Sequence, residues 1–147
     1  MKYGSKPPIV ASFLPDVEED CVIETMVEVP LVDRLRAGLL MEEFSAVQRL
    51  LEISEEELGR LVGISAATLH RRKRSGHLET PESERVVRFA RLFGLAMEVL
   101  ESEAAAREWL KSKNPATAGE APLSYADTEF GAREVEHVLG RLDHGVF

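Results

Sequence analysis

The chain has 147 residues, 44% of them hydrophobic, and a formal net charge of −8. This size suits one compact domain or two small ones, and the acidic balance argues against nonspecific coating of nucleic acid. We find no apolar run of roughly 18 residues that would span a membrane and no apolar signal-peptide core. The one cysteine, Cys21, cannot form an internal disulfide, so we expect a cytoplasmic protein.

The charge is unevenly distributed along the chain. Residues 16–29 carry six acids and no Lys or Arg, whereas residues 45–77 carry six basic residues against four acids. Residues 98–147 are acidic again, with ten acids against five basic residues. A basic module inside an acidic chain is typical of a protein that contacts DNA with one face and a different partner elsewhere.

The first 30 residues are predicted to form a flexible or extended arm. Residues 1–15 contain three prolines and a glycine, which disfavour a helix interior. Apolar residues alternate in residues 21–29, which is compatible with a short strand that pairs across a dimer.

Helical periodicity predicts two helices before the central motif. One opens at Pro30 or Leu31 and stops at Gly38, because proline suits a first turn and glycine ends a helix. The second covers residues 39–53 and would support the motif that follows. Its apolar stripe consists of Phe44, Val47, Leu50 and Leu51.

Residues 54–76 are typical of a helix-turn-helix. Ser54 can cap the first helix in a capping box with Glu57, and Gly63 can end that helix with a positive φ. Ile64 would fill the space between the two helices, and Ser65 would cap the second one.

The second helix has the composition of a DNA recognition helix. If Leu69 points inward, small and basic side chains point outward, where they can reach base edges and phosphates. We expect Arg71 to pair with a guanine and Arg72, Lys73 and Arg74 to hold phosphates. The alternative is a plain helical hairpin with a solvated basic end. The candidate DNA-binding residues are Ser65, Ala66, Ala67, Thr68, His70, Arg71, Arg72, Lys73 and Arg74.

The second half of the chain is predicted to contain three more helices and one short helical turn. Thr80 would cap a helix that begins with Pro81 and runs to about Leu100, with an apolar stripe of Val86, Ala90, Phe93, Met97 and Leu100. Ser102 would cap a helix over residues 103–111, in which Trp109 and Leu110 face inward. A loop over residues 114–122 leads to a short turn at Pro122 or Leu123. Thr128 would cap the last helix, residues 129–143, whose apolar side consists of Val135, Val138, Leu139 and Leu142.

The sequence offers little support for an enzyme. Glu134 and His137 form one Glu-x-x-His pair, whereas a di-iron site needs two such pairs and a zinc site needs more Cys or His. Cys21 lies in an acidic stretch, which makes it a poor nucleophile. We therefore expect no catalytic residues, no metal and no cofactor.

The C-terminal half resembles the toxin-binding domain of Xre-type antitoxins that pair with RES-domain toxins. The resemblance rests on a spaced pattern in this sequence: Trp109-Leu110, Asn114-Pro115, Gly119, Pro122-Leu123, Asp127-Thr128, Gly131, Arg133, Val135, Leu139-Gly140-Arg141 and Gly145. The helix-turn-helix is similar to that of the same family. Two positions depart from it, since Glu55 stands where Gln is usual and Gly59 stands where Ala is usual. A carboxylate at Glu55 would repel a phosphate.

The resemblance implies an antitoxin that binds and silences a RES-domain toxin acting on NAD and represses its own promoter. The last helix and the tail would contact the toxin, through Arg133, Glu134, His137, Arg141, Asp143, His144, Val146 and Phe147. The alternatives are that Arg133 and Glu134 are only surface charges and that the terminal Phe folds back on its own domain.

We thus predict an all-α protein with a helix-turn-helix DNA-binding module followed by a small helical C-terminal toxin-binding domain. The predicted division is an arm at residues 1–30, a DNA-binding and dimerisation domain at 31–100, and a toxin-binding domain at 101–147. Operator DNA, the RES-domain toxin and a second copy in a homodimer are the expected partners, and a membrane is not. The alternative function is a free-standing transcriptional regulator whose C-terminal domain dimerises or senses a ligand.

Overall fold

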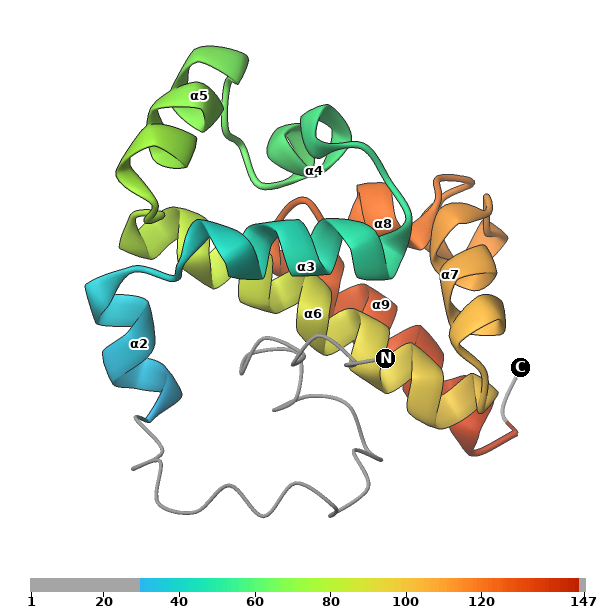
Figure 1. Ribbon diagram of the computed structural model, residues 1–147. Helices are drawn as coiled ribbons and strands as arrows, with labels where there is room; N and C mark the ends of the chain where they lie inside the picture. Colours follow the sequence, from blue (N-terminus) through green and yellow to red (C-terminus); the bar gives the residue numbers. More distant parts are fainter. Residues whose placement is uncertain (1–29, 146–147) are drawn as a thin grey trace, which may run out of the picture.

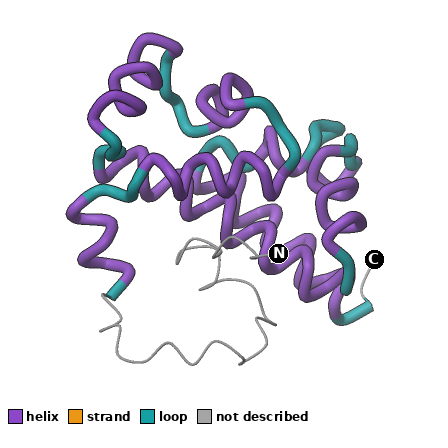
Figure 2. Tube along the Cα trace, in the orientation of Figure 1, coloured by secondary structure: helices purple, strands orange, loops and turns teal. Residues whose placement is uncertain are grey.

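The computed structural model describes residues 30–145 as an all-α fold, as predicted (Figure 1). Within the described residues, two helices precede the central motif: α2 (Leu31–Ala37) and α3 (Met41–Leu51). The motif itself consists of α4 (Glu55–Leu61) and α5 (Ala66–Ser75). After it come α6 (Thr80–Leu100), α7 (Glu103–Lys111), the 3-10 helix η1 (Pro115–Thr117), α8 (Pro122–Tyr125) and α9 (Glu129–Asp143). Between residues 30 and 145 the trace contains helices and loops without a strand (Figure 2).

The long helix α6 is the central element of the core. It contacts α2, α3, α7 and α9, and it crosses the centre of the molecule in Figure 1. Buried apolar side chains from residue 39 to residue 139 form one cluster around it. The stripe predicted for α6 supplies part of this core, because Val86, Ala90 and Phe93 are at most 2% exposed. Met97 packs against the same cluster while partly exposed.

The last helices bury the sides that periodicity predicted. Val135, Val138 and Leu139 of α9 are buried, and Leu142 is half-buried. Leu110 of α7 is fully buried, whereas Trp109 beside it is only half-buried against the core. Apolar stripes therefore predicted which face of each helix meets α6.

Four helix starts are capped as the sequence indicated. In each, a hydroxyl oxygen accepts a hydrogen bond from the backbone N–H three residues further on, which satisfies a donor that the helix leaves unpaired. The distances are 3.0 Å for Ser54, 3.2 Å for Ser65, 3.2 Å for Ser102 and 3.0 Å for Thr128. Such caps depend on neighbours in the chain, which is why their positions could be predicted.

Two predicted helix-capping contacts need correction. Only the Ser54 half of the predicted capping box forms, because the Glu57 carboxylate lies 3.9 Å from Arg60 instead. Thr80 does not cap α6: its hydroxyl donates to the carbonyl of Arg36 (3.2 Å), and Glu79 is the residue before the helix. Both polar side chains thus bind partners other than the helix end.

The support helix starts two residues later than predicted. Leu40 is extended and forms an antiparallel bridge with His77, and next to it the Leu78 N–H donates to the Leu39 carbonyl (2.8 Å). The Glu43 carboxylate accepts from the Leu40 N–H (3.1 Å), which sets the start of α3 at Met41. These backbone contacts hold together the first and last residues of the segment 39–78, which contains the helix-turn-helix.

Several predictions lie outside the described residues. They are the flexible or extended arm before Pro30, the strand at residues 21–29, and the tail contacts of Val146 and Phe147. The domain boundary at residue 100 also stays a prediction. Within residues 30–145, no helix has the length and hydropathy needed to cross a membrane.

Candidate functional site

The helix-turn-helix consists of α4, a four-residue turn and α5. Gly63 in the turn has φ +74°, a left-handed conformation that glycine adopts readily, as predicted. Ile64 is buried, and its N–H donates to the carbonyl of Gly59 (2.7 Å). Leu69 of α5 is also buried, so α5 packs its apolar side against α4. The Arg85 guanidinium of α6 donates to the Val62 carbonyl (3.0 Å) and holds the turn against the core.

The outer face of α5 carries the residues proposed for DNA contact. Thr68 is half-buried, and Arg71 donates to its hydroxyl (3.0 Å), which restrains the Arg71 guanidinium near the start of the helix. Small side chains at the helix start leave space for a close partner. Seven of the candidates are exposed: Ser65, Ala66, Ala67, His70, Arg71, Lys73 and Arg74.

Arg72 differs from its basic neighbours. Its Nε donates to both carboxylate oxygens of Glu82 (2.8 and 3.1 Å), and its Nη2 lies 3.2 Å from Glu79. The side chain is only 17% exposed. Arg72 therefore joins α5 to the start of α6, and its geometry does not support the predicted role of holding a phosphate.

Glu55 and Lys73 form an ion pair between the start of α4 and the end of α5. The two residues are 18 positions apart in the chain, so the sequence alone did not indicate this contact. The pair offsets the negative charge that Glu55 would otherwise present to a phosphate. The ion pair also engages Lys73, one of the cations proposed to bind DNA.

The last helix presents the residues proposed for toxin contact on its outer side. Arg133 lies 3.8 Å from Glu129 one turn earlier, and Glu134 is half-buried. The remaining candidates that the structure describes are exposed: His137, Arg141, Asp143 and His144. Among residues 30–145, no cluster of three or more His, Cys, Asp or Glu is placed to hold a metal.

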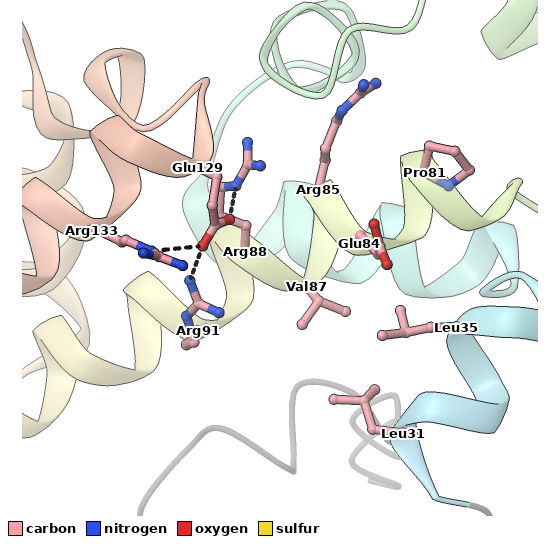
Figure 3. A pocket seen from close by; sticks show the side chains of 10 residues that line it. All are labelled: Leu31, Leu35, Pro81, Glu84, Arg85, Val87, Arg88, Arg91, Glu129 and Arg133. Atoms are coloured by element: carbon pink, nitrogen blue, oxygen red, sulfur yellow. Dashed lines mark hydrogen bonds and ion pairs between the residues drawn. The ribbon is translucent and has the colours of Figure 1, made fainter.

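The structure reveals an arginine cluster that sequence reasoning missed. A groove of about 720 Å³ lies between α2, α6 and α9, with Leu31 and Leu35 on one side (Figure 3). On its other side the Glu129 carboxylate forms ion pairs with Arg88 (3.2 Å), Arg91 (3.7 Å) and Arg133 (3.8 Å). Arg88 also donates to the Asp127 carbonyl (3.0 Å). The cluster attaches the start of α9 to α6, so it positions the outer face of α9.

A second missed residue is Phe130, in the first turn of α9. Its side chain is 77% exposed, although every apolar residue that we had assigned to the inner side of this helix is at least half-buried. Phe130 lies off the apolar stripe of α9, which is the signal that could have identified it from the sequence. Beside it is a hollow of about 300 Å³, which is also lined by Tyr125, Glu120 and Asp127.

Comparison with known proteins matches both halves of the described chain. Residues 30–91 match the family model of the antitoxin Xre-like helix-turn-helix domain. Residues 95–145 match that of the antitoxin Xre/MbcA/ParS C-terminal toxin-binding domain. The first match contains the exposed face of α5, and the second contains the exposed face of α9.

Two curated relatives are similar along most of the chain. Antitoxin Xre of Yersinia enterocolitica is 32% identical over 119 residues, which is 80% of each chain. Antitoxin Xre of Photorhabdus laumondii is 28% identical over 114 residues, which is 76% of this chain and 77% of the relative. With 32% identity to a curated antitoxin over 80% of its length and matches to both family models, this chain belongs to the Xre antitoxin family, in which a helix-turn-helix domain is joined to a toxin-binding domain.

Proposed function

We propose that this chain neutralises a RES-domain toxin that acts on NAD and represses its own operon through α5. The observation that carries the proposal is the joining of two surfaces in one chain: the exposed basic face of α5 and the α9 face within the match to a toxin-binding domain. In this proposal the chain works in the cytoplasm as a binding protein without catalysis of its own.

The choice of a RES-domain toxin rests on the sequence pattern and on charge. A toxin that uses NAD needs cationic groups to hold the pyrophosphate. Residues 98–147 have five more acids than bases and are therefore steered toward such a surface. The end of α9 adds exposed charged side chains, among them Arg141 and Asp143, that can cover the toxin cleft.

The proposed DNA surface is the outer face of α5 without Arg72. Ala66 and Ala67 allow the helix start to approach base edges, and Arg71 is placed to pair with a guanine. Arg74 is exposed one turn later and would contact a phosphate. We expect a homodimer, because helix-turn-helix proteins read two half-sites about one DNA turn apart.

The decisive experiment is to purify the tagged full-length chain from its native host and identify bound proteins by mass spectrometry. We expect a near-stoichiometric RES-domain protein whose expression alone depletes cellular NAD and whose activity the antitoxin abolishes. Recovery of the chain alone, or with DNA only, would instead support a free-standing regulator.

The contribution of the chain end can be measured with a protein truncated after Gly140. We expect this variant to lose inhibition of the toxin while it still binds operator DNA, because the DNA face lies on α5. Circular dichroism and a thermal melt check that the fold is retained. Full inhibition by the truncated protein would place the contact elsewhere on the molecule.

A further inference from the structure

Phe130 is held in an exposed position by the local backbone. Thr128 caps α9 by accepting a hydrogen bond from the Gly131 N–H (3.0 Å). Gly131 itself lies so close to the Tyr125 carbonyl of α8 that a Cβ atom there would overlap it. Because these contacts set the start and rotation of α9, the Phe130 ring cannot turn inward without breaking them.

The exposed ring extends the charged face of α9 toward its N-terminus. Residues 130, 134, 137 and 141 are spaced by 4, 3 and 4, so they lie along one side of the helix. The opposite side carries the buried residues Val135, Val138 and Leu139. At 1.5 Å per residue, the outer face is roughly 16 Å long, with an aromatic ring at one end.

Acidic groups lie beside the ring. Glu120 and Asp127 are exposed and line the hollow beside Phe130, together with the half-buried Tyr125. These carboxylates would repel the phosphates of DNA, so the chemistry of this surface suits a protein with basic side chains. Phe130 lies within residues 95–145, which match a toxin-binding domain. We therefore identify this basic partner protein as the toxin.

We propose that Phe130 is the aromatic anchor of the toxin interface, inserting into an apolar pocket on the toxin whose rim carries Lys or Arg facing Glu120 and Asp127. This inference rests on the proposed antitoxin function and adds a contact at the start of α9 to those expected at its end. Buried aromatic side chains often contribute most of the binding free energy of an interface, whereas rim charges chiefly set the association rate.

The test compares Phe130→Ala with Val32→Ala, which truncates another exposed apolar side chain but lies on α2. The probe is the RES-domain toxin that co-purifies with the wild-type chain, titrated against each full-length variant. We expect Phe130→Ala to bind about 30-fold more weakly, Phe130→Tyr to bind within about threefold of wild type, and Val32→Ala to bind like wild type.

Fold and DNA binding act as internal controls. Since the ring is largely exposed, all three variants should melt like wild type and bind operator DNA equally well. If Phe130→Ala binds the toxin like wild type, the anchor assignment is wrong while the antitoxin function stands. If Phe130→Ala changes the molecular mass of the toxin-free protein in light scattering, the ring serves self-association and the anchor assignment is also wrong. If wild type captures no RES-domain toxin, both the inference and the proposed function fail.

Discussion

The four consecutive basic residues of α5 have different environments, although they look alike in the sequence. Arg71 hydrogen-bonds Thr68 on its own helix, and Lys73 pairs with Glu55 of α4. Arg72 is bound to two carboxylates near the start of α6 and is mostly buried, whereas Arg74 is exposed. A basic run is therefore not a uniform DNA-binding surface, because three of these four cations already bind acceptors of the protein itself.

At this scale, Arg71 and Arg74 should affect DNA binding differently. Arg71→Ala should relax sequence preference at one base position, since a guanine contact carries specificity. Arg74→Ala should weaken binding to all sequences alike, since a phosphate contact carries none. Competition binding with operator and scrambled duplexes measures both effects. Wild-type behaviour of both variants would contradict the assignment of α5 as a recognition helix.

Replacing Glu55 with Gln should strengthen DNA binding. The substitution removes a negative charge and releases Lys73 to reach a phosphate. We expect about fivefold higher affinity and a salt dependence steeper by about 0.9 in log–log slope, as for one added phosphate contact. Glu56→Gln is the matched control, because it removes the same charge from the next residue of α4, which is exposed. An equal gain in both variants would indicate a general charge effect and not release of Lys73.

At the scale of elements, the junction of α8 and α9 depends on close backbone packing. The cap at Thr128 and the contact of Gly131 with the Tyr125 carbonyl place the first turn of α9 directly against α8. Two arginines of α6, Arg88 and Arg91, then attach that turn to α6 through Glu129. The orientation of the proposed toxin face is thus set at its N-terminal end.

Two glycines of α9 should respond oppositely to the same substitution. Gly131→Ala places a Cβ onto a backbone carbonyl and should destabilise the protein by about 3 kcal/mol. Gly140→Ala has no atom within 4 Å of the added Cβ and should stabilise the helix by about 0.5–1 kcal/mol. Urea unfolding of both variants gives the two free energies. Similar stability of the two variants would show that α8 can move aside.

At the scale of the molecule, side chains of α7 connect the C-terminal half to the helix before the DNA-binding motif. The Arg107 Nε donates to the Leu50 carbonyl at the end of α3 (2.7 Å), and Lys111 donates to the Glu52 carbonyl (3.3 Å). Glu52 has φ +53°, so the chain turns sharply where these cations bind. The two functional halves therefore share contacts besides the core around α6.

Loss of Arg107 should destabilise the whole molecule. Arg107→Ala leaves the part-buried Leu50 carbonyl without its donor and should cost about 1–2 kcal/mol in free energy of unfolding. Lys111→Ala removes an exposed contact and should cost less than about 0.5 kcal/mol. Both values can be obtained from urea unfolding followed by circular dichroism. Equal small costs would mean that water replaces the guanidinium at this carbonyl.

The predictions that succeeded depend on interactions between residues close in sequence. Ser54, Ser65 and Thr128 cap helices because the donor that each satisfies lies three positions away. Gly63 ends α4 because its own φ permits the turn. All-α class, helix order and the buried faces follow from such short-range rules together with apolar periodicity.

Contacts between distant helices account for what sequence reasoning missed. Arg72 meets Glu82 and Lys73 meets Glu55 only because folding brings separate helices together. Phe130 differs from these residues, because its place off the apolar stripe of α9 could have indicated its exposure, and the contacts of α8 and α6 with the start of α9 maintain that exposure. Local sequence thus specifies the helices and their apolar sides. The packing of those helices determines which charged and aromatic groups remain accessible to DNA or toxin, because accessibility depends on the distance to the nearest partner in space.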